Sequence, residues 1–112
     1  MKHYLAYDGG GTTTRAGLYD AEGHLLAEAL GGASNPVALG VNVCLSVLVQ
    51  VGRDAVAQAG DEVDAIGVAL SGAWTSGMGV WLANRLCERF RAARAVVCDD
   101  IRPILFANIG DA

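Results

Sequence analysis

The order of hydrophobic and polar positions predicts three strands at the start of the chain. Residues 3–8 mix aromatic and aliphatic side chains and end at a run of glycines, which indicates a strand closed by a tight turn. Residues 15–20 and 24–30 follow as two more strands, separated by Asp20-Ala21-Glu22-Gly23. Because acidic residues and glycine are typical of hairpin turns, we expect the three strands to form an antiparallel meander.

A helical period begins after a loop at Gly31 to Pro36. From Val41 to Ala59 apolar residues recur at three- and four-residue steps, as on one face of a helix, and Gly60 is a suitable stop. The short apolar run from Val63 to Leu70 then predicts a buried strand.

The second half of the chain continues this alternation. A glycine-rich connection leads into a helix expected from about Val80 to Arg91 and a further buried strand at Ala95 to Cys98, and residues 101–109 can start a third helix. The order is β-β-β-α-β-α-β-α, in which consecutive β-α-β units imply parallel strands with right-handed crossovers. The predicted fold class is therefore α/β, with a mixed sheet flanked by helices.

Composition and charge exclude several classes of protein. The chain has 112 residues, of which 53% are apolar and 18% charged, and this excludes a disordered chain. The large apolar share suggests a surface that a partner or another part of the same protein covers. The net charge is −4, and the single basic cluster, formed by Arg85, Arg89, Arg91 and Arg94, is better explained as a solvated helix end than as a nucleic-acid site.

The cysteines and the uncharged segments add further exclusions. Cys44, Cys87 and Cys98 form no CxxC pair, so we expect reduced, buried thiols in a cytoplasmic protein rather than a zinc site or a disulfide framework. The uncharged segments 29–52 and 65–84 are interrupted by polar residues, which argues against a membrane span. Neither nucleic acid nor a membrane is therefore an expected partner.

The strongest local motif is the turn between the first two strands. Glycines let backbone N–H groups approach a phosphate without a Cβ atom in the way, and threonines add hydroxyl donors. A carboxylate at the end of the first strand can hold Mg²⁺, which offsets phosphate charge. A plain glycine-rich hairpin is the alternative, although it requires neither the acid nor the threonines. The motif consists of Asp8, Gly9, Gly10, Gly11, Thr12, Thr13 and Thr14.

Further polar side chains follow later elements of the pattern. Asp99 and Asp100 come directly after the last predicted strand, and if that strand is parallel to the first, Asp100 and Asp8 can meet at one cleft and accept a proton there. An ordinary helix N-cap is the alternative. Asn35 offers a donor and an acceptor to sugar hydroxyls but also fits a helix-entry loop, and Ser71-Gly72 suits either a close ligand or a turn.

These features occur together in an order that resembles a known family. The turn at 8–14, the Asn35 loop, Ser71-Gly72 after a strand and Asp100 after a later strand are similar to the N-terminal lobe of the N-acetylglucosamine kinase and BadF/BadG/BcrA/BcrD ATPase family. That family is part of the sugar kinase and actin superfamily, whose lobes have a ribonuclease-H-like fold. The resemblance covers essentially the whole chain and implies one lobe at 1–112, with the C-terminal lobe outside it.

The resemblance implies an ATP-dependent phosphotransferase that acts on an amino sugar, glucosamine or N-acetylglucosamine. Catalysis in such a site is mostly positioning and charge stabilisation. The lobe alone is expected to be inactive, and it is a candidate for homodimer formation through its apolar face. The implied roles are Mg²⁺ and phosphate binding at Asp8, phosphate binding at Gly9, Gly10, Gly11, Thr12 and Thr13, sugar binding at Asn35, Ser71, Gly72 and Asp100, and proton transfer at Asp100.

One departure and three other functions stay open at this point. The family commonly has a basic residue at the position of Thr13, so Arg15 or the other lobe would have to compensate the phosphate charge. An ATPase activator with an iron–sulfur cluster is disfavoured because Cys44 and Cys98 are predicted in the core. A non-catalytic sugar-binding or dimerisation module is the second alternative. A ribonuclease-H-type nuclease is the third, and the acidic charge argues against it.

Overall fold

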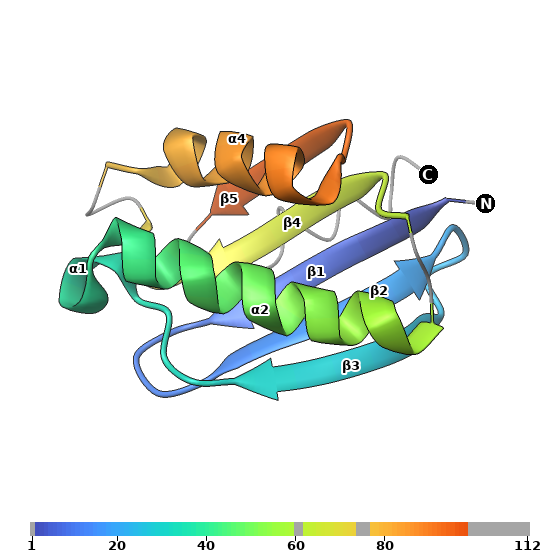
Figure 1. Ribbon diagram of the computed structural model, residues 1–112, viewed down its shortest axis with the longest axis horizontal. Coiled ribbons are helices and arrows are strands. Elements are labelled where there is room, and N and C mark those ends of the chain that lie inside the picture. Colours follow the sequence, from blue (N-terminus) through green and yellow to red (C-terminus); the bar gives the residue numbers. More distant parts are fainter. Residues whose placement is uncertain (1, 60–61, 74–76, 99–112) are drawn as a thin grey trace.

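The computed structural model describes residues 2–59, 62–73 and 77–98. Within them a short helix precedes the first long one, and strands and helices otherwise follow the predicted order (Figure 1). The strands are β1 (His3–Gly9), β2 (Thr14–Asp20), β3 (Leu25–Gly31), β4 (Ala65–Leu70) and β5 (Arg94–Cys98), and the helices are α1 (Pro36–Leu39), α2 (Val41–Ala59) and α4 (Gly79–Phe90).

The five described strands form one mixed sheet in the order β3-β2-β1-β4-β5. β1 pairs antiparallel with β2, and β2 pairs antiparallel with β3, which confirms the predicted meander. β4 lies parallel to β1, and β5 lies parallel to β4, as expected for strands joined by helical crossovers (Figure 1). The carboxyl ends of β1, β4 and β5 therefore share one edge of the sheet.

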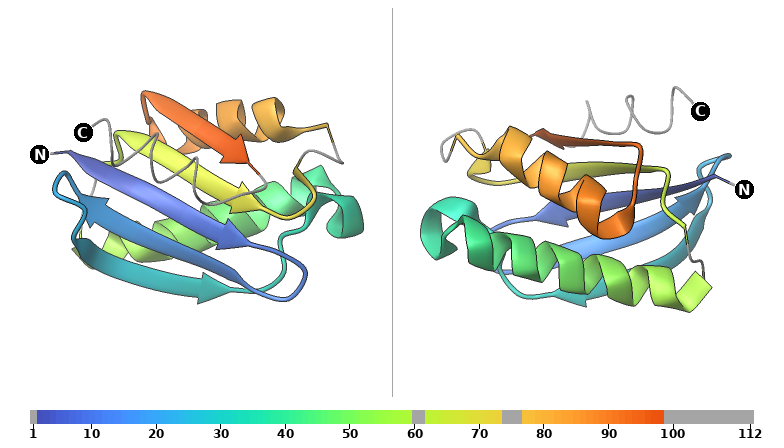
Figure 2. Two further views of the ribbon diagram at one scale, coloured as in Figure 1. Left: turned by 180° about the vertical axis from the view of Figure 1, so that it is seen from behind. Right: turned by 45° about the horizontal axis from the view of Figure 1, so that its top comes forward.

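Both long helices cover the same face of the sheet (Figures 1 and 2). Helix α2 packs on β2 and β3, helix α4 packs on β5, and the two helices contact each other. An apolar core lies between these layers, and Leu5, Leu18 and Leu48 are fully buried in it. The Tyr7 hydroxyl donates a 2.6 Å hydrogen bond to the carbonyl of Leu48, and burial raises the pKa of this tyrosine.

Gly52 sets how closely α2 approaches the sheet. A Cβ atom at this position would collide with the Tyr7 hydroxyl and would lie 2.7 Å from the ring carbon Cζ of Phe90. Glycine in a helix interior costs about 0.5–1 kcal/mol relative to alanine. The close packing of β1, α2 and α4 at this point therefore explains why the middle of α2 contains a glycine.

Strand β5 and helix α1 differ from the expectations. The sequence predicts a buried strand at Ala95 to Cys98, but the residues of β5 are exposed or half-buried because β5 lies at the edge of the described sheet. Helix α1 has four residues, too few to show a helical period in the sequence. Gly60 and the predicted third helix at 101–109 lie outside the described residues.

The cysteines and arginines can also be compared with the expectations from the sequence. All three cysteines are free, but only Cys44 is buried as expected, because Cys87 and Cys98 belong to the half-covered elements α4 and β5. Arg89 and Arg91 are exposed at the end of α4, as predicted. Arg85 is instead half-buried within α4, where its guanidinium lies 5.7 Å from the ring centre of Trp81, and Arg94 begins β5. Among the described residues, no helix combines the length and the apolar character needed to cross a membrane.

Candidate functional site

The glycine–threonine loop connects β1 to β2 at the carboxyl end of β1. The N–H of Gly10 donates to the carbonyl of Thr13 over 3.1 Å, which closes the loop as a tight turn. Beside it, the N–H of Ser71 donates to the carbonyl of Gly9 over 3.1 Å, so the end of β4 is tied to the end of β1. The structure thus brings two of the predicted site segments together at the sheet edge where ligands bind in α/β folds.

The three glycines of the loop are in different surroundings. A Cβ atom on Gly9 would collide with the hydroxyl of Ser34, so the fold itself requires this glycine. A Cβ atom on Gly10 would lie 3.5 Å from the hydroxyl oxygen of Ser71, an ordinary contact, and one on Gly11 would meet nothing within 4 Å. Neither Gly10 nor Gly11 has a left-handed φ angle. The fold therefore tolerates side chains at these two positions, and a ligand that approaches the backbone closely would explain why there are none.

A hollow of about 430 Å³ lies against this loop. Most of its lining belongs to the predicted site, whereas two further lining residues come from the neighbouring strands. The strand register aligns Arg15 of β2 with Asp8 of β1 on one side and with Leu30 of β3 on the other. The lining residues are Asp8, Gly9, Gly10, Thr12, Thr13, Ser71, Arg15 and Leu30.

Polar groups of both signs surround the hollow. The carboxyl group of Asp8 is exposed at its rim, and the Arg15 guanidinium lies on the neighbouring strand, where its Nε is 3.8 Å from a carboxylate oxygen of Glu28. The backbone N–H groups of Gly11, Thr12 and Thr13 form no backbone hydrogen bond within the ranges that the structure describes. Consecutive amides of this kind, with a guanidinium nearby, can bind an anion.

Asn35 and Gly72 lie against each other a short way along the same edge. The Asn35 carbonyl oxygen Oδ1 accepts hydrogen bonds from the N–H groups of Val37, over 2.9 Å, and Ala38, over 3.4 Å, and so caps α1. A Cβ atom on Gly72, whose φ angle is +87°, would lie 2.5 Å from that oxygen. The capping role expected as an alternative is thus present, and it leaves the amide nitrogen of Asn35 as the donor that a ligand can use.

Asp100, the predicted base, lies outside the described residues. The strand that precedes it in the sequence, β5, is parallel to β1 and is separated from it only by β4. The topological condition for a shared acidic cleft is therefore met, because the carboxyl ends of β1 and β5 lie at the same edge of the sheet.

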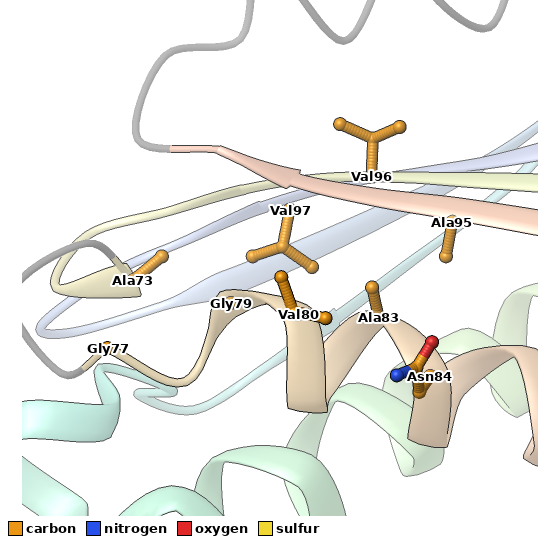
Figure 3. Close-up of a pocket in the computed structure, with 9 residues that line it drawn as sticks. All are labelled: Ala73, Gly77, Gly79, Val80, Ala83, Asn84, Ala95, Val96 and Val97. Atoms are coloured by element: carbon orange, nitrogen blue, oxygen red, sulfur yellow. The ribbon is translucent and has the colours of Figure 1, made fainter.

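A second hollow, of about 360 Å³, lies between α4 and β5 (Figure 3). The side chains of Val80, Ala83 and Val97 point into the space between the helix and the strand, and among the described lining residues only Asn84 has a polar side chain. It shares no lining residue with the hollow at the glycine loop. Its described lining is mostly apolar and includes no charged side chain.

A small polar cluster occupies the turn between β2 and β3. Ligand-type atoms of Asp20, Glu22 and His24 lie within 4.8 Å of one another. The Asp20 carboxylate accepts hydrogen bonds from the N–H groups of His24, over 2.9 Å, and Glu22, over 3.0 Å, and the His24 bond in particular holds the pKa of Asp20 below its usual value. These bonds within the turn account for the arrangement without a ligand.

Comparison with known proteins finds similarity both in sequence and in fold. No model of a protein family matches the chain. The chain is 37% identical to glucosamine kinase GspK of Vibrio cholerae serotype O1, in an alignment of 78 residues that covers 65% of the chain. Its fold matches a Chromobacterium violaceum crystal structure, provisionally named an N-acetylglucosamine kinase, with a TM-score of 0.71 and 26% identity over 95% of the chain. The chain spans 26% of the length of the first relative and 38% of the second.

Both proteins are named as kinases of an amino sugar, which is glucosamine in one name and N-acetylglucosamine in the other. One relative was found through its sequence and the other through its fold, and both lead to the same group of enzymes. The chain is thus similar to proteins that are named as amino-sugar kinases, and its mixed α/β sheet resembles part of their N-terminal region.

Proposed function

We propose that this chain is the N-terminal lobe of an ATP-dependent amino-sugar kinase and that its β1–β2 loop binds phosphates of ATP. The observation that carries the proposal is the hollow at this loop, which is lined by glycine and threonine where the fold itself would tolerate a side chain at Gly10. The names of the two relatives support an amino sugar as the acceptor. The three cysteines are free thiols, which is compatible with a protein that acts in the reducing cytoplasm, where ATP is available.

In the proposed kinase the loop and its flanking strands hold the anion. The free amides of Gly11, Thr12 and Thr13 donate to phosphate oxygens, and Arg15 supplies the positive charge that Thr13 cannot. Asp8 fits a Mg²⁺ site, since its carboxylate is exposed at the rim of the hollow and Mg²⁺ in phosphoryl-transfer sites combines one or two carboxylates with phosphate and water. Bound Mg²⁺ would neutralise charge on the phosphates.

The sugar is proposed to bind along the same edge of the sheet. Because Oδ1 of Asn35 is used in capping α1, the side chain would donate from its amide nitrogen to a sugar oxygen. Ser71 and Gly72 follow β4 between the loop and Asn35 and would form the floor beneath the sugar. Asp100, which follows β5 in the sequence, is the proposed base for the attacking hydroxyl.

An ATPase activator with an iron–sulfur cluster receives no support from the described cysteines. Cluster ligands are thiolates, whereas burial raises the pKa of the Cys44 thiol to about 11. Burial also raises the pKa of Cys87. Both changes disfavour the thiolate, so Cys44 and Cys87 give no support to a cluster.

The test is release of ADP by the full-length protein that contains this chain, with glucosamine and with N-acetylglucosamine as acceptors. The Gly10→Ala variant is expected to fold, but its new methyl group would hold the phosphate away from the amides that follow it. We expect the KM for ATP to rise about tenfold, as for the weakening of one charge-assisted hydrogen bond, which is worth about 1.5–3 kcal/mol. Gly79→Ala is the matched control, because its Cβ would make only ordinary contacts with Val97 and the residue does not line the hollow at the loop, so the KM for ATP should not change. No ADP release with either sugar, or an unchanged KM for Gly10→Ala, would contradict the proposal.

A further inference from the structure

Two hydroxyl side chains are completely buried behind the glycine loop. Thr14 and Ser34 each have an exposed fraction of 0%. A hydroxyl group buried without a hydrogen bond costs free energy, so its partners are informative. Thr14 begins β2 directly after the proposed phosphate loop, and Ser34 directly precedes Asn35 in the connection from β3 to α1. The pair therefore joins the two loops to which different ligands are assigned.

The bonds between these hydroxyls have one possible direction. The Thr14 oxygen Oγ1 lies 2.7 Å from the carbonyl oxygen of Gly32 and 2.7 Å from the Ser34 oxygen Oγ. A carbonyl oxygen can only accept, and a hydroxyl has a single proton. Thr14 therefore donates to Gly32, and Ser34 donates to Thr14. Each buried hydroxyl proton is used, which makes the chain of bonds complete in itself.

Backbone contacts reinforce the same connection. The N–H of Ser34 donates to the carbonyl of Gly10 over 3.0 Å. The absent Cβ of Gly9 leaves the space that the Ser34 hydroxyl occupies. The connection from β3 to α1 thus contacts the β1–β2 loop and its flanking residues through Ser34 and Gly32.

We propose that Thr14 and Ser34 are positioning residues that hold the phosphate loop and the Asn35 loop in one arrangement, so that ATP and the amino sugar bind in register. The proposal rests on the proposed function and adds to it residues that touch neither ligand, since both are fully buried. If the two loops separate in a fraction of the molecules, the apparent affinity for each ligand falls by the fraction that remains competent. Both ligands are therefore affected together.

The test uses steady-state kinetics of the full-length protein with ATP and glucosamine. Thr14→Val keeps the shape and removes the hydroxyl, and it is expected to raise both KM values about tenfold, as for a competent fraction of about one tenth. Ser34→Ala leaves the Thr14–Gly32 bond in place, so we expect both KM values to rise about threefold. Thr14→Ser keeps the hydroxyl and should restore both values to within about twofold of the original.

A control separates positioning from a general loss of stability. Val63 is buried beside the amino end of β4, at the opposite end of the sheet, and Val63→Ala should lower stability without raising either KM. If the original protein releases no ADP, the proposed function fails and the positioning role fails with it. If the original protein is active, unchanged KM values in both Thr14→Val and Ser34→Ala, or a rise for one ligand only, overturn the positioning role alone. Should Thr14→Val not fold, Ser34→Ala decides.

Discussion

The packing of Gly9 against Ser34 leads to a prediction about a pair of substitutions. In Gly9→Ala the new methyl group collides with the Ser34 hydroxyl and lies 3.1 Å from Cδ1 of Leu70. Overpacking of this kind lowers the free energy of unfolding by about 1–3 kcal/mol. Ser34→Ala removes one hydrogen bond while Thr14 keeps its bond to a carbonyl, so its cost is about 1 kcal/mol.

The double variant distinguishes this contact from two independent effects. Alanine at position 34 removes the atom with which the new methyl group of Gly9→Ala collides. The double variant is therefore expected to lose about 1–2 kcal/mol less than the sum of the single losses, as for residues in direct contact. Leu70 still restricts the methyl group, so the rescue is partial.

Urea unfolding followed by circular dichroism measures all four proteins in this cycle. Equal m-values would show that the change is one of stability, read from the midpoints. Single-variant losses that add to within about 0.5 kcal/mol in the double variant would refute the reasoning, because additivity is the behaviour of residues that do not touch. Gly11→Ala is a suitable reference, since nothing lies within 4 Å of its Cβ position and its stability should be unchanged or slightly raised.

Three other measurements test separate parts of the structure. Tyr7→Phe removes a buried 2.6 Å hydrogen bond and should lower the free energy of unfolding by about 1 kcal/mol in the same urea assay. Gly72→Ala combines a left-handed φ angle with a contact to Asn35, and should cost about 1–2 kcal/mol. In an NMR titration Asp20 should show a pKa below that of an ordinary aspartate. The stability that the turn gains from this carboxylate is therefore complete above the unfolded-state pKa and is lost as the pH falls through the lower folded-state pKa. His24→Ala keeps the backbone bond and should raise this pKa only in part.

The main elements could be predicted because their signals are local. The apolar period of α2 and the short apolar run of β4 lie between glycines, and each predicted boundary falls within two residues of the observed one. The antiparallel pairing of the first three strands follows from the hairpins, and the parallel pairing of the later strands follows from the helical crossovers, whereas the place of β4 beside β1 was not predicted. The exposure of β5 could not be predicted, because the burial of an apolar strand depends on the elements that cover it.

The candidate site was predictable in its residues more than in its contacts. The glycine–threonine loop and Ser71 have a recognisable composition, and they line one hollow. Arg15 was already expected near the phosphates, whereas Leu30 was not; both line the hollow through the strand register, which apolar patterns do not determine here. The bond between Thr14 and Ser34 connects residues that are 20 positions apart, with no local signal in either segment.

The packing of α2 on the sheet has a consequence for the edge of the sheet at which the candidate site lies. One residue, Gly40, separates α2 from α1, and Asn35 caps α1, so the position of α2 on the sheet also affects the position of Asn35. Gly52 is the residue at which α2 packs directly against Tyr7. A bulkier residue there would move α2 away from the sheet and shift Asn35 with it. The proposed affinity for the sugar should therefore respond to a substitution at position 52, far along the sequence from Asn35.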